Sequence, residues 1–148
     1  MLLVQPNDDN LEMYAEFLSH AGLTPIPVSS AIDALAAAAR ADIVVTGLRL
    51  PGSVDGIELI ARLRQRRRTK RTPIIVLTAS ALQAERDRAK RAGCDAFLPK
   101  PCLPEELLRE VRRLVKPSKL RHLRNASLKA SLAHSVRDGK QRAKKHGA

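Results

Sequence analysis

The sequence has few of the residues that crosslink small domains or stack on nucleic-acid bases. It contains only two cysteines, Cys94 and Cys102, and no tryptophan. No Cys-x-x-Cys pair is present and the histidines are not grouped with the cysteines, so disulfide scaffolds, zinc sites and dithiol redox sites are excluded. The three aromatic residues, Tyr14, Phe17 and Phe97, are too few for a sheet that stacks bases. We therefore expect two reduced structural cysteines and a core that forms without crosslinks.

Long hydrophobic runs are also missing. A membrane helix needs roughly 20 consecutive apolar residues, but the apolar start at residues 1–4 is interrupted at once by Gln5, Pro6 and the polar residues 7–9. The sequence therefore predicts a soluble, cytoplasmic chain with no membrane partner.

The charge is distributed unevenly along the 148 residues. The formal net charge is +12, yet residues 1–115 hold 17 basic and 14 acidic residues, whereas residues 116–148 hold 10 basic and one acidic residue. A second basic cluster puts seven Lys or Arg residues between Arg62 and Arg71. With 44% hydrophobic residues, the composition is that of a globular protein. These numbers predict one domain over 1–115 followed by a basic tail over 116–148.

The tail shows only a weak helical pattern. Leu128, Leu132 and Val136 share one helix face, but Leu120 and Leu123 lie off it, and the residues after 139 offer nothing apolar to bury. We expect a segment that is partly helical or disordered, too short for a helix-turn-helix domain and without a catalytic motif.

Short β-type runs alternate with helical patterns across the first 115 residues. The strand candidates are 2–4, 24–28, 43–46, 73–77 and 96–98, and the helix candidates are 11–20, 31–40, 57–66, 82–92 and 104–115. Ser30, Asp55 and Ser80 precede helices as capping residues, while Gly22 and Gly93 end two of them. This order predicts an α/β fold of the (βα)5 type, a doubly wound five-stranded parallel sheet with flavodoxin-like topology.

In such a sheet, the functional crevice lies beyond the carboxyl ends of the strands. The residues expected there follow four of the strand candidates: Gln5 and Pro6, Thr46 and Gly47, Thr78 and Ala79, and the segment 99–101.

Several motifs, in order and at matching spacing, resemble the receiver domain of two-component (phosphorelay) response regulators. The resemblance extends from residue 1 to about residue 115. It rests on Glu12-Met13-Tyr14, the segment 42–45 leading into Leu50-Pro51-Gly52, Asp55-Gly56-Ile57-Glu58-Leu59, the segment 73–79, the segment 92–101 and Leu103-Pro104-Glu105-Glu106-Leu107.

The resemblance implies a phosphoacceptor aspartate after the third strand and a metal-binding acidic pair after the first. In this chain, Gly47 occupies the acceptor position, and Gln5 and Pro6 occupy the positions of the pair. Glycine cannot form an acyl phosphate, and a neutral amide is a poor ligand for Mg²⁺. We therefore predict a pseudo-receiver that is not an enzyme, with no catalytic, cofactor or metal residues and with Mg²⁺ binding lost or weak.

Other family positions are retained. Thr78 matches the hydroxyl that contacts the phosphoryl group, Phe97 the switch aromatic and Lys100 the phosphate-pairing lysine. For Thr78 and Phe97, structural roles are the favoured interpretation: turn capping by Thr78 and strand packing by Phe97. Thr46 should point away from the crevice, because side chains alternate along a strand. The Lys100-Pro101 bond is left open between cis and trans.

Asp8 and Asp9 fit the start of the first helix, where they would cap it and favour its dipole. A displaced metal site is the alternative role for these two acids.

Three functional hypotheses follow. The first is a single-domain signalling protein that acts without phosphorylation, by protein contact through the face that resembles α4-β5-α5 of the family (82–92, 95–98 and 103–115); homodimerisation is one form of this. The second is a nucleic-acid-associated regulator that binds phosphates through the tail 116–148 and the Arg62–Arg71 cluster. The third is a phospho-accepting receiver with an unrecognised acceptor.

Overall fold

The computed structural model describes residues 1–6, 9–80 and 82–115. The basic tail predicted at 116–148 and the capping role predicted for Asp8 lie outside the described residues. The elements are β1 (Leu2–Val4), α1 (Asp9–His20), β2 (Ile26–Val28), α2 (Ala31–Ala37), the 3₁₀ helix η1 (Ala38–Arg40), β3 (Val44–Thr46), α3 (Gly56–Gln65), β4 (Ile74–Thr78), α4 (Gln83–Ala92), β5 (Ala96–Pro99) and α5 (Pro104–Leu114).

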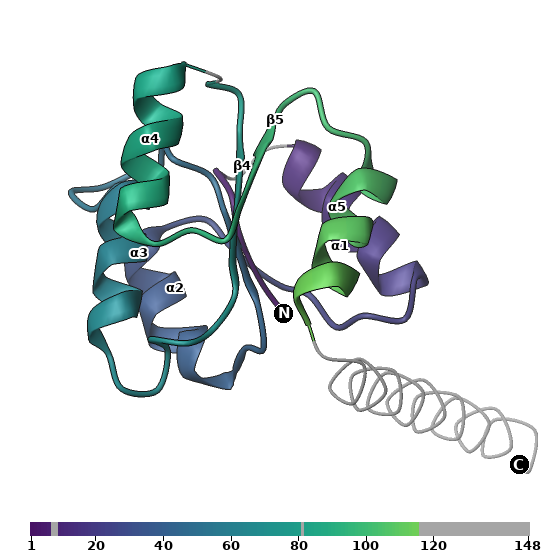
Figure 1. Cartoon of the computed structure of the whole chain (residues 1–148). Helices are drawn as coiled ribbons and strands as arrows, with labels where there is room; N and C mark the ends of the chain where they lie inside the picture. Colours follow the sequence, from purple (N-terminus) through teal and green to yellow (C-terminus); the bar gives the residue numbers. More distant parts are fainter. Residues whose placement is uncertain (7–8, 81, 116–148) are drawn as a thin grey trace, which may run out of the picture.

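The five strands form one parallel sheet in the order β2-β1-β3-β4-β5. Strand β1 pairs with both β2 and β3, so the chain first winds to one edge of the sheet and then crosses back to build the other (Figure 1). The predicted (βα)5 doubly wound fold is confirmed. All strands point the same way, so their carboxyl ends meet along one edge of the sheet.

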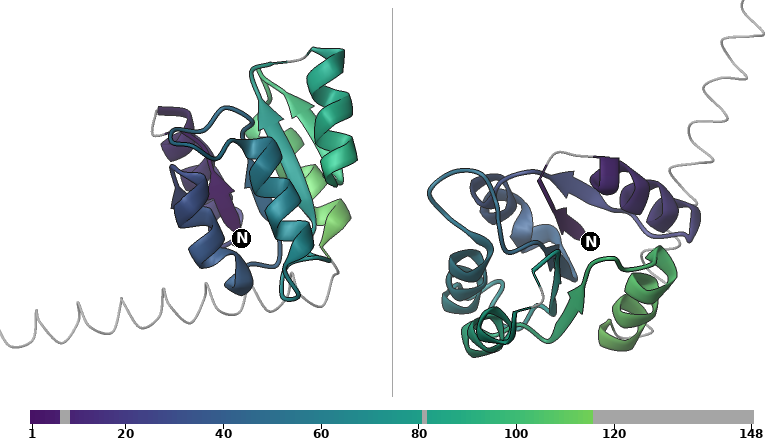
Figure 2. Two further views of the ribbon diagram at one scale, coloured as in Figure 1. Left: turned by 90° about the vertical axis from the view of Figure 1, so that its left-hand side faces the viewer. Right: turned by 90° about the horizontal axis from the view of Figure 1, so that it is seen from above.

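Helices cover both faces of the sheet (Figures 1 and 2). One core lies between the sheet and helices α1 and α5, and the other lies between the sheet and helices α2, α3 and α4. Alternation along β1 shows the division: Leu3 belongs to the first core, whereas Leu2 and Val4 belong to the second. Both faces are buried, which is why the strand sequences are continuous apolar runs.

Local capping agrees with the sequence at four helix ends. The Ser30 hydroxyl accepts a hydrogen bond from the Asp33 N–H at 3.2 Å, and the Asp55 carboxylate accepts one from the Glu58 N–H at 2.8 Å. Gly93 ends α4 at φ +118°, a left-handed conformation that favours glycine. Gly22, which follows α1, is also at positive φ, as expected.

Two boundaries differ from the prediction. Helix α4 begins at Gln83 after Leu82, which makes no side-chain cap, and not from a cap at Ser80. Ser80 lies in the turn after β4, where its N–H donates to the Thr78 hydroxyl at 3.3 Å. The helix predicted over 31–40 is α-helical only to Ala37 and then tightens into η1, because its alanine-rich end carries no glycine or side-chain cap.

Three of the seven basic residues in the cluster predicted at Arg62–Arg71 form side-chain contacts within the domain. Arg62 pairs with Glu58 at 2.7 Å, and Arg66 donates to the Leu35 carbonyl at 3.1 Å. Arg64 donates to several carbonyls at the junction of α3, β4 and α4. Arg62 and Arg66 are exposed as well as bonded, and four further exposed basic residues follow in the loop after α3: Arg67, Arg68, Lys70 and Arg71.

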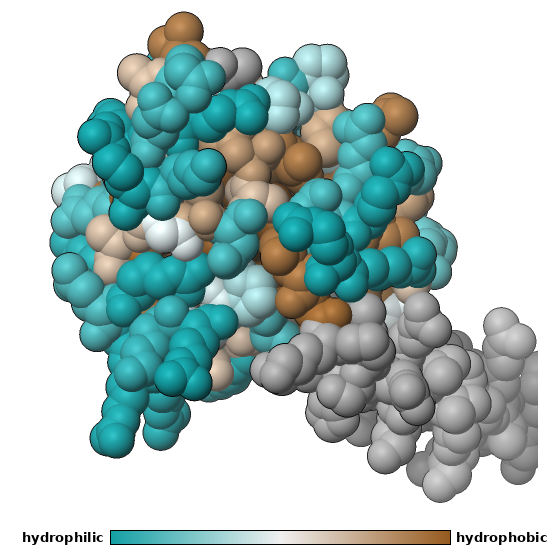
Figure 3. All heavy atoms as spheres, in the orientation of Figure 1, coloured by the Kyte–Doolittle hydropathy of each residue, from teal (hydrophilic) through white to brown (hydrophobic). Residues whose placement is uncertain are grey.

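Figure 3 shows how hydrophilic and hydrophobic side chains are distributed over one face of the domain. Hydrophilic side chains gather over the left and lower left of that face, where α3 and α4 lie, and apolar side chains show between the two helical layers. Within the described residues, no helix is long and apolar enough to cross a membrane.

Both cysteines are free thiols, as expected, and burial raises the pKa of each. For Cys102, burial and the neighbouring Glu106 carboxylate raise the pKa to about 11. A thiol with this pKa is almost entirely protonated at neutral pH, which fits a structural role.

Candidate functional site

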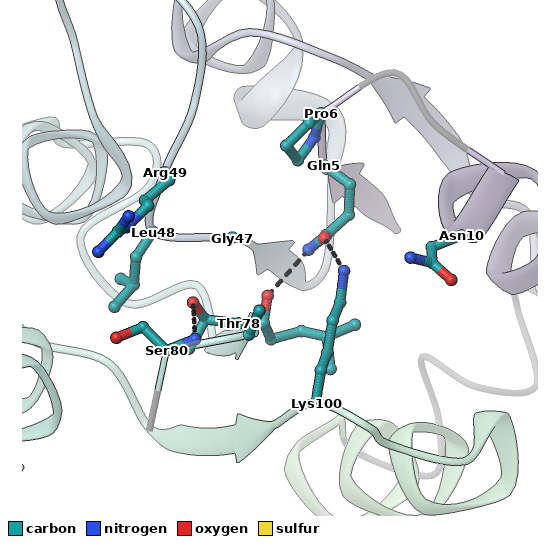
Figure 4. A pocket seen from close by; sticks show the side chains of 11 residues that line it. Gln5, Pro6, Asn10, Gly47, Leu48, Arg49, Thr78, Ser80 and Lys100 are labelled. Atoms are coloured by element: carbon teal, nitrogen blue, oxygen red, sulfur yellow. Dashed lines mark hydrogen bonds between the residues drawn. The ribbon is translucent and has the colours of Figure 1, made fainter. Parts of the chain in front are cut away.

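The carboxyl edge of the sheet is hollowed into an open pocket of about 450 Å³ (Figure 4). Five of the sequence-predicted site residues are brought together there, from the ends of four different elements. The lining residues are Gln5, Pro6, Asn10, Gly47, Leu48, Arg49, Leu77, Thr78, Ala79, Ser80 and Lys100.

Gln5, directly after β1, is the most deeply buried polar residue of the pocket. Its side chain is held from both ends: Nε2 donates to the Leu77 carbonyl at 3.2 Å, and Oε1 accepts from the Lys100 ammonium at 2.9 Å. A carbonyl only accepts and an ammonium only donates, so these two partners fix which end of the amide carries the oxygen. The Gln5 residue is 1% exposed, so this amide is part of the interior rather than a mobile surface group.

Lys100 is positioned by the turn that follows β5. Its backbone N–H donates to the Thr78 carbonyl at 2.7 Å, and the Lys100-Pro101 peptide bond, which the sequence left open, is cis. The ammonium points toward Gln5 and lies 6.0 Å from the centroid of the Tyr14 ring. The Lys100 ammonium is therefore bonded to the neutral amide of Gln5, which does not neutralise its positive charge.

Gly47, directly after β3, leaves space beside this pair. A Cβ atom built on Gly47 would lie 3.5 Å from Gln5 Nε2, 3.6 Å from Gln5 Oε1 and 3.6 Å from the Leu77 carbonyl oxygen, which are ordinary contacts. Neither space nor a left-handed backbone requires glycine here. The neighbouring Thr46 is fully buried, does not line the pocket and donates its hydroxyl to the Gly47 carbonyl at 2.8 Å, as the strand alternation predicts.

The structure places two of the residues predicted to act as a switch, Thr78 and Phe97, in different surroundings. Thr78 lines the pocket, and its hydroxyl accepts the N–H of Ser80, which is the turn-capping role. Phe97 does not line it: this half-buried ring packs against the core below α3 and α4, with the Arg86 guanidinium 4.8 Å from its centroid. The cation over the ring and the core beneath it hold Phe97 away from the pocket.

Sequence reasoning missed Arg49 and Asn10, which also line the pocket. Arg49 stands on the opposite side from Lys100 (Figure 4). Its side chain is 82% exposed, and its Nη2 lies 3.8 Å from Glu85 Oε1, farther than a hydrogen bond. The position of Arg49, three residues after β3, was the available sequence clue.

The charge of the pocket is positive. Arg49 and Lys100 line it, and among its described residues there is no carboxylate. The oxygen of Gln5 that points inward is already bonded to Lys100. Within the described residues, no three His, Cys, Asp or Glu side chains come close enough to hold a metal ion.

The whole domain matches the family model of the response regulator receiver domain over residues 1–112. The fold and the location of the pocket define a receiver-type module, and the chain belongs to the response regulator receiver family. It therefore carries a receiver domain of the kind used in two-component signalling.

Individual relatives agree with this assignment. The phosphate regulon transcriptional regulatory protein PhoB of Rhizobium meliloti is 42% identical over 78 residues, which cover 53% of this chain and 34% of PhoB. The chain thus spans about a third of the length of that relative.

Solved structures show the same fold. The chemotaxis protein CheY4 of Vibrio cholerae superposes with a TM-score of 0.71 at 28% identity, covering 77% of this chain and 96% of that one. The receiver domain of the sensor histidine kinase PA1611 from Pseudomonas aeruginosa, with a magnesium ion coordinated in its active site cleft, gives a TM-score of 0.66 at 30% identity, covering 76% and 94%.

The magnesium ion expected of this family does not suit the donors found here. Mg²⁺ requires several oxygen ligands, usually including carboxylates, and it dehydrates reluctantly. The described lining offers hydroxyls and amides beside two cations, and the Lys100 ammonium is bonded to the Gln5 amide. The arrangement favours negative charge over a divalent cation.

Proposed function

We propose that this chain is a pseudo-receiver, a non-enzymatic signalling module that works by protein contact and without phosphorylation of its domain. The observation that carries the proposal is the Gln5–Lys100 hydrogen bond beside Gly47. An amide bonds the lysine where the family has acids, and the acceptor position has no side chain.

The chemistry of phosphoryl transfer supports this proposal. An acyl phosphate needs a carboxylate nucleophile, and the transferring group needs positive charge to offset its own. Lys100 and the Thr78 hydroxyl are in place at the pocket, but the described lining holds no carboxylate that could attack. Two parts of the family's machinery are thus present without the group on which they act.

A partner is expected at the face formed by α4, β5 and α5. Large apolar residues are exposed at the start of both helices: Leu82 is 64% and Leu103 is 63% exposed. Basic residues predominate along α4, whereas Glu105 and Glu106 open α5. Apolar and oppositely charged areas on one face suit a protein partner or a reciprocal contact in a homodimer.

The direct test is incubation of the full chain with a small phosphodonor and Mg²⁺, followed by intact-mass measurement. We expect no mass increase from a phosphoryl group, because the described lining of the pocket holds no carboxylate that could form an acyl phosphate. A receiver domain with the complete aspartate set, treated in parallel, serves as the positive control. Stoichiometric phosphorylation of this chain would contradict the proposal and support an unrecognised acceptor.

A second function is favoured by one observation, the exposed basic loop after α3. Arg67, Arg68, Lys70 and Arg71 are exposed, and no ion pair is found for them among the described residues. Clustered exposed cations bind nucleic-acid phosphates without sequence preference. Together with the basic residues of 116–148, this loop would form a salt-sensitive nucleic-acid contact.

We expect the full chain to bind labelled duplex DNA at low salt, with an affinity that falls steeply as salt rises. Replacing Arg67, Arg68, Lys70 and Arg71 by Ala should reduce the slope of log affinity against log salt by up to about 4, or roughly 0.9 per lost phosphate contact. The matched control replaces Arg88, Lys90, Arg91 and Arg112, which are exposed on other elements. DNA binding that is absent at low salt, or equal slopes for both variants, would exclude this function for the loop.

A further inference from the structure

The first third of the domain carries no basic residue. Residues 1–39 contain five Asp or Glu and no Lys or Arg, although the whole chain is strongly basic. In the structure, this segment forms β1, α1, β2, α2 and the first residues of η1. The edge of the sheet at β2, with the helices beside it, therefore has the opposite charge to the rest of the chain.

This edge is hollowed into a groove of about 420 Å³, separate from the pocket at the carboxyl edge. Four of its lining residues are apolar, and two exposed acids, Glu12 and Asp33, stand among them. The residues that form it are Leu11, Glu12, Ala15, Pro27, Val28, Ser29 and Asp33.

The elements around the groove have further features of a contact surface. Met13 on α1, Ile26 on β2 and Ile32 on α2 are 39%, 37% and 64% exposed, so each element presents a large apolar side chain to solvent. Strand β2 is an edge strand, and Pro27 at its centre removes a backbone N–H. Because of that proline, pairing with an added strand is disfavoured, and side-chain contacts are the expected mode of binding.

We propose that this groove, here called the acidic groove, binds the basic segment 116–148 of the same chain. The segment carries ten basic residues against one acidic residue, and its Leu128, Leu132 and Val136 recur at intervals of four. In a helix, these three residues would form one apolar stripe flanked by cations. The acidic groove, lined by apolar residues and two acids, is complementary to such a stripe in both polarity and charge.

The connection is long enough for this contact within one chain. Residues 116–127 separate the end of the described domain from Leu128 and span up to about 40 Å when extended, comparable to the diameter of a domain of this size. Helix α5 packs against α1 in the same core, so the segment leaves the domain next to a helix that borders the groove. This inference does not depend on whether the domain accepts phosphate.

Amide hydrogen exchange of the intact full chain, read by mass spectrometry, tests the contact. At about 0.01 M salt, we expect residues 116–148 to exchange more slowly than a synthetic peptide of the same sequence. Raising the salt to about 1 M shortens the Debye length from about 30 Å to about 3 Å and should remove most of this protection. Protection that is unchanged by salt, or absent at low salt, would overturn the proposal.

Reversing the charges of the acidic groove tests whether the segment binds at this site. The double variant Glu12→Lys and Asp33→Lys should increase the exchange rate of 116–148 about tenfold, as expected for reversing two exposed charge contacts. The matched control compares Asp33→Lys alone with Glu105→Lys, which reverses an exposed acid in the first turn of α5, as Asp33 is in the first turn of α2. An equal effect of the control, at equal thermal stability, would overturn the assignment to the acidic groove.

Diluting the protein distinguishes a contact within one chain from a contact between two chains. Protection that is independent of protein concentration is expected for a contact within the chain. If protection falls on dilution, the segment binds the groove of a second copy, and the proposal as stated is wrong. If the reversed variant fails to fold, the salt and dilution measurements on the natural chain still decide the outcome.

Discussion

A chain that carries Gln5→Asp, Pro6→Asp and Gly47→Asp together is expected to take up phosphate from a small phosphodonor in the presence of Mg²⁺, where the natural chain takes up none. The geometry allows this gain. A Cβ at Gly47 meets only ordinary contacts at 3.5–3.6 Å, and Lys100 and Thr78 already lie at the pocket. Three carboxylates would supply the nucleophile and the oxygen ligands that Mg²⁺ prefers, and would pair the Lys100 ammonium with negative charge.

The measurement is the intact mass of each chain as a function of time. We expect the phosphorylated fraction to be undetectable for the natural chain and large for the triple variant. Gly47→Asp alone is the matched control, because it supplies the acceptor without the metal ligands and should label far more slowly. Omitting Mg²⁺ should abolish labelling of the triple variant. A triple variant that folds and binds Mg²⁺ but stays unlabelled would show that more than these three positions separates this chain from a phosphorylated receiver.

Arg64→Ala is expected to lower the free energy of unfolding by about 3 kcal/mol. The guanidinium donates to the Thr72 carbonyl at 2.6 Å and to the Gly93 carbonyl at 2.9 and 3.0 Å, and it pairs with Asp95 at 2.9 Å. Its side chain is only 22% exposed. Removing it leaves partly buried carbonyls without donors and leaves Asp95, which also accepts the Ile74 N–H, without its cation.

Thermal unfolding of this variant should shift by roughly 10 to 20 °C, measured by calorimetry or circular dichroism. Arg64→Lys should recover only part of the loss, since an ammonium cannot form the same forked bonds. The control, Arg68→Ala, removes an exposed cation close in sequence and should change the unfolding free energy by less than about 0.5 kcal/mol. If Arg64→Ala and Arg68→Ala have equal stability, the interactions of Arg64 are not what holds α3, β4 and α4 together.

Most of the fold follows from local sequence. The buried strands are apolar runs, Ser30 and Asp55 cap the helices that follow them, and Gly93 ends α4 with the backbone conformation that glycine allows. The boundaries of α2 and α4 were less predictable. Helix ends without side-chain caps depend on tertiary packing and on the turn around Ser80, which no local pattern encodes.

The sequence predicted which residues lie at the candidate site, but not which groups their side chains contact. Counting from the motifs placed Gln5, Gly47, Thr78 and Lys100 at one edge of the sheet, because parallel strands bring their carboxyl ends together. The motifs also placed Phe97 on the last strand, and the structure packs its half-buried ring against the core, as the strand-packing interpretation predicts. A position in a motif gives the strand of a side chain, but its packing neighbours decide where the side chain points.

The sequence by itself determined the order of strands and helices and the residues that follow each strand, Gln5, Pro6 and Gly47 among them, since both are properties of residue type and spacing. Only the tertiary structure decided what those residues contact. The Gln5 amide bonds Lys100 across 95 positions of chain, and Arg64 leaves the basic cluster to bind the carbonyl of Gly93. Such contacts join residues far apart in the sequence, so their geometry exists only once the sheet has assembled.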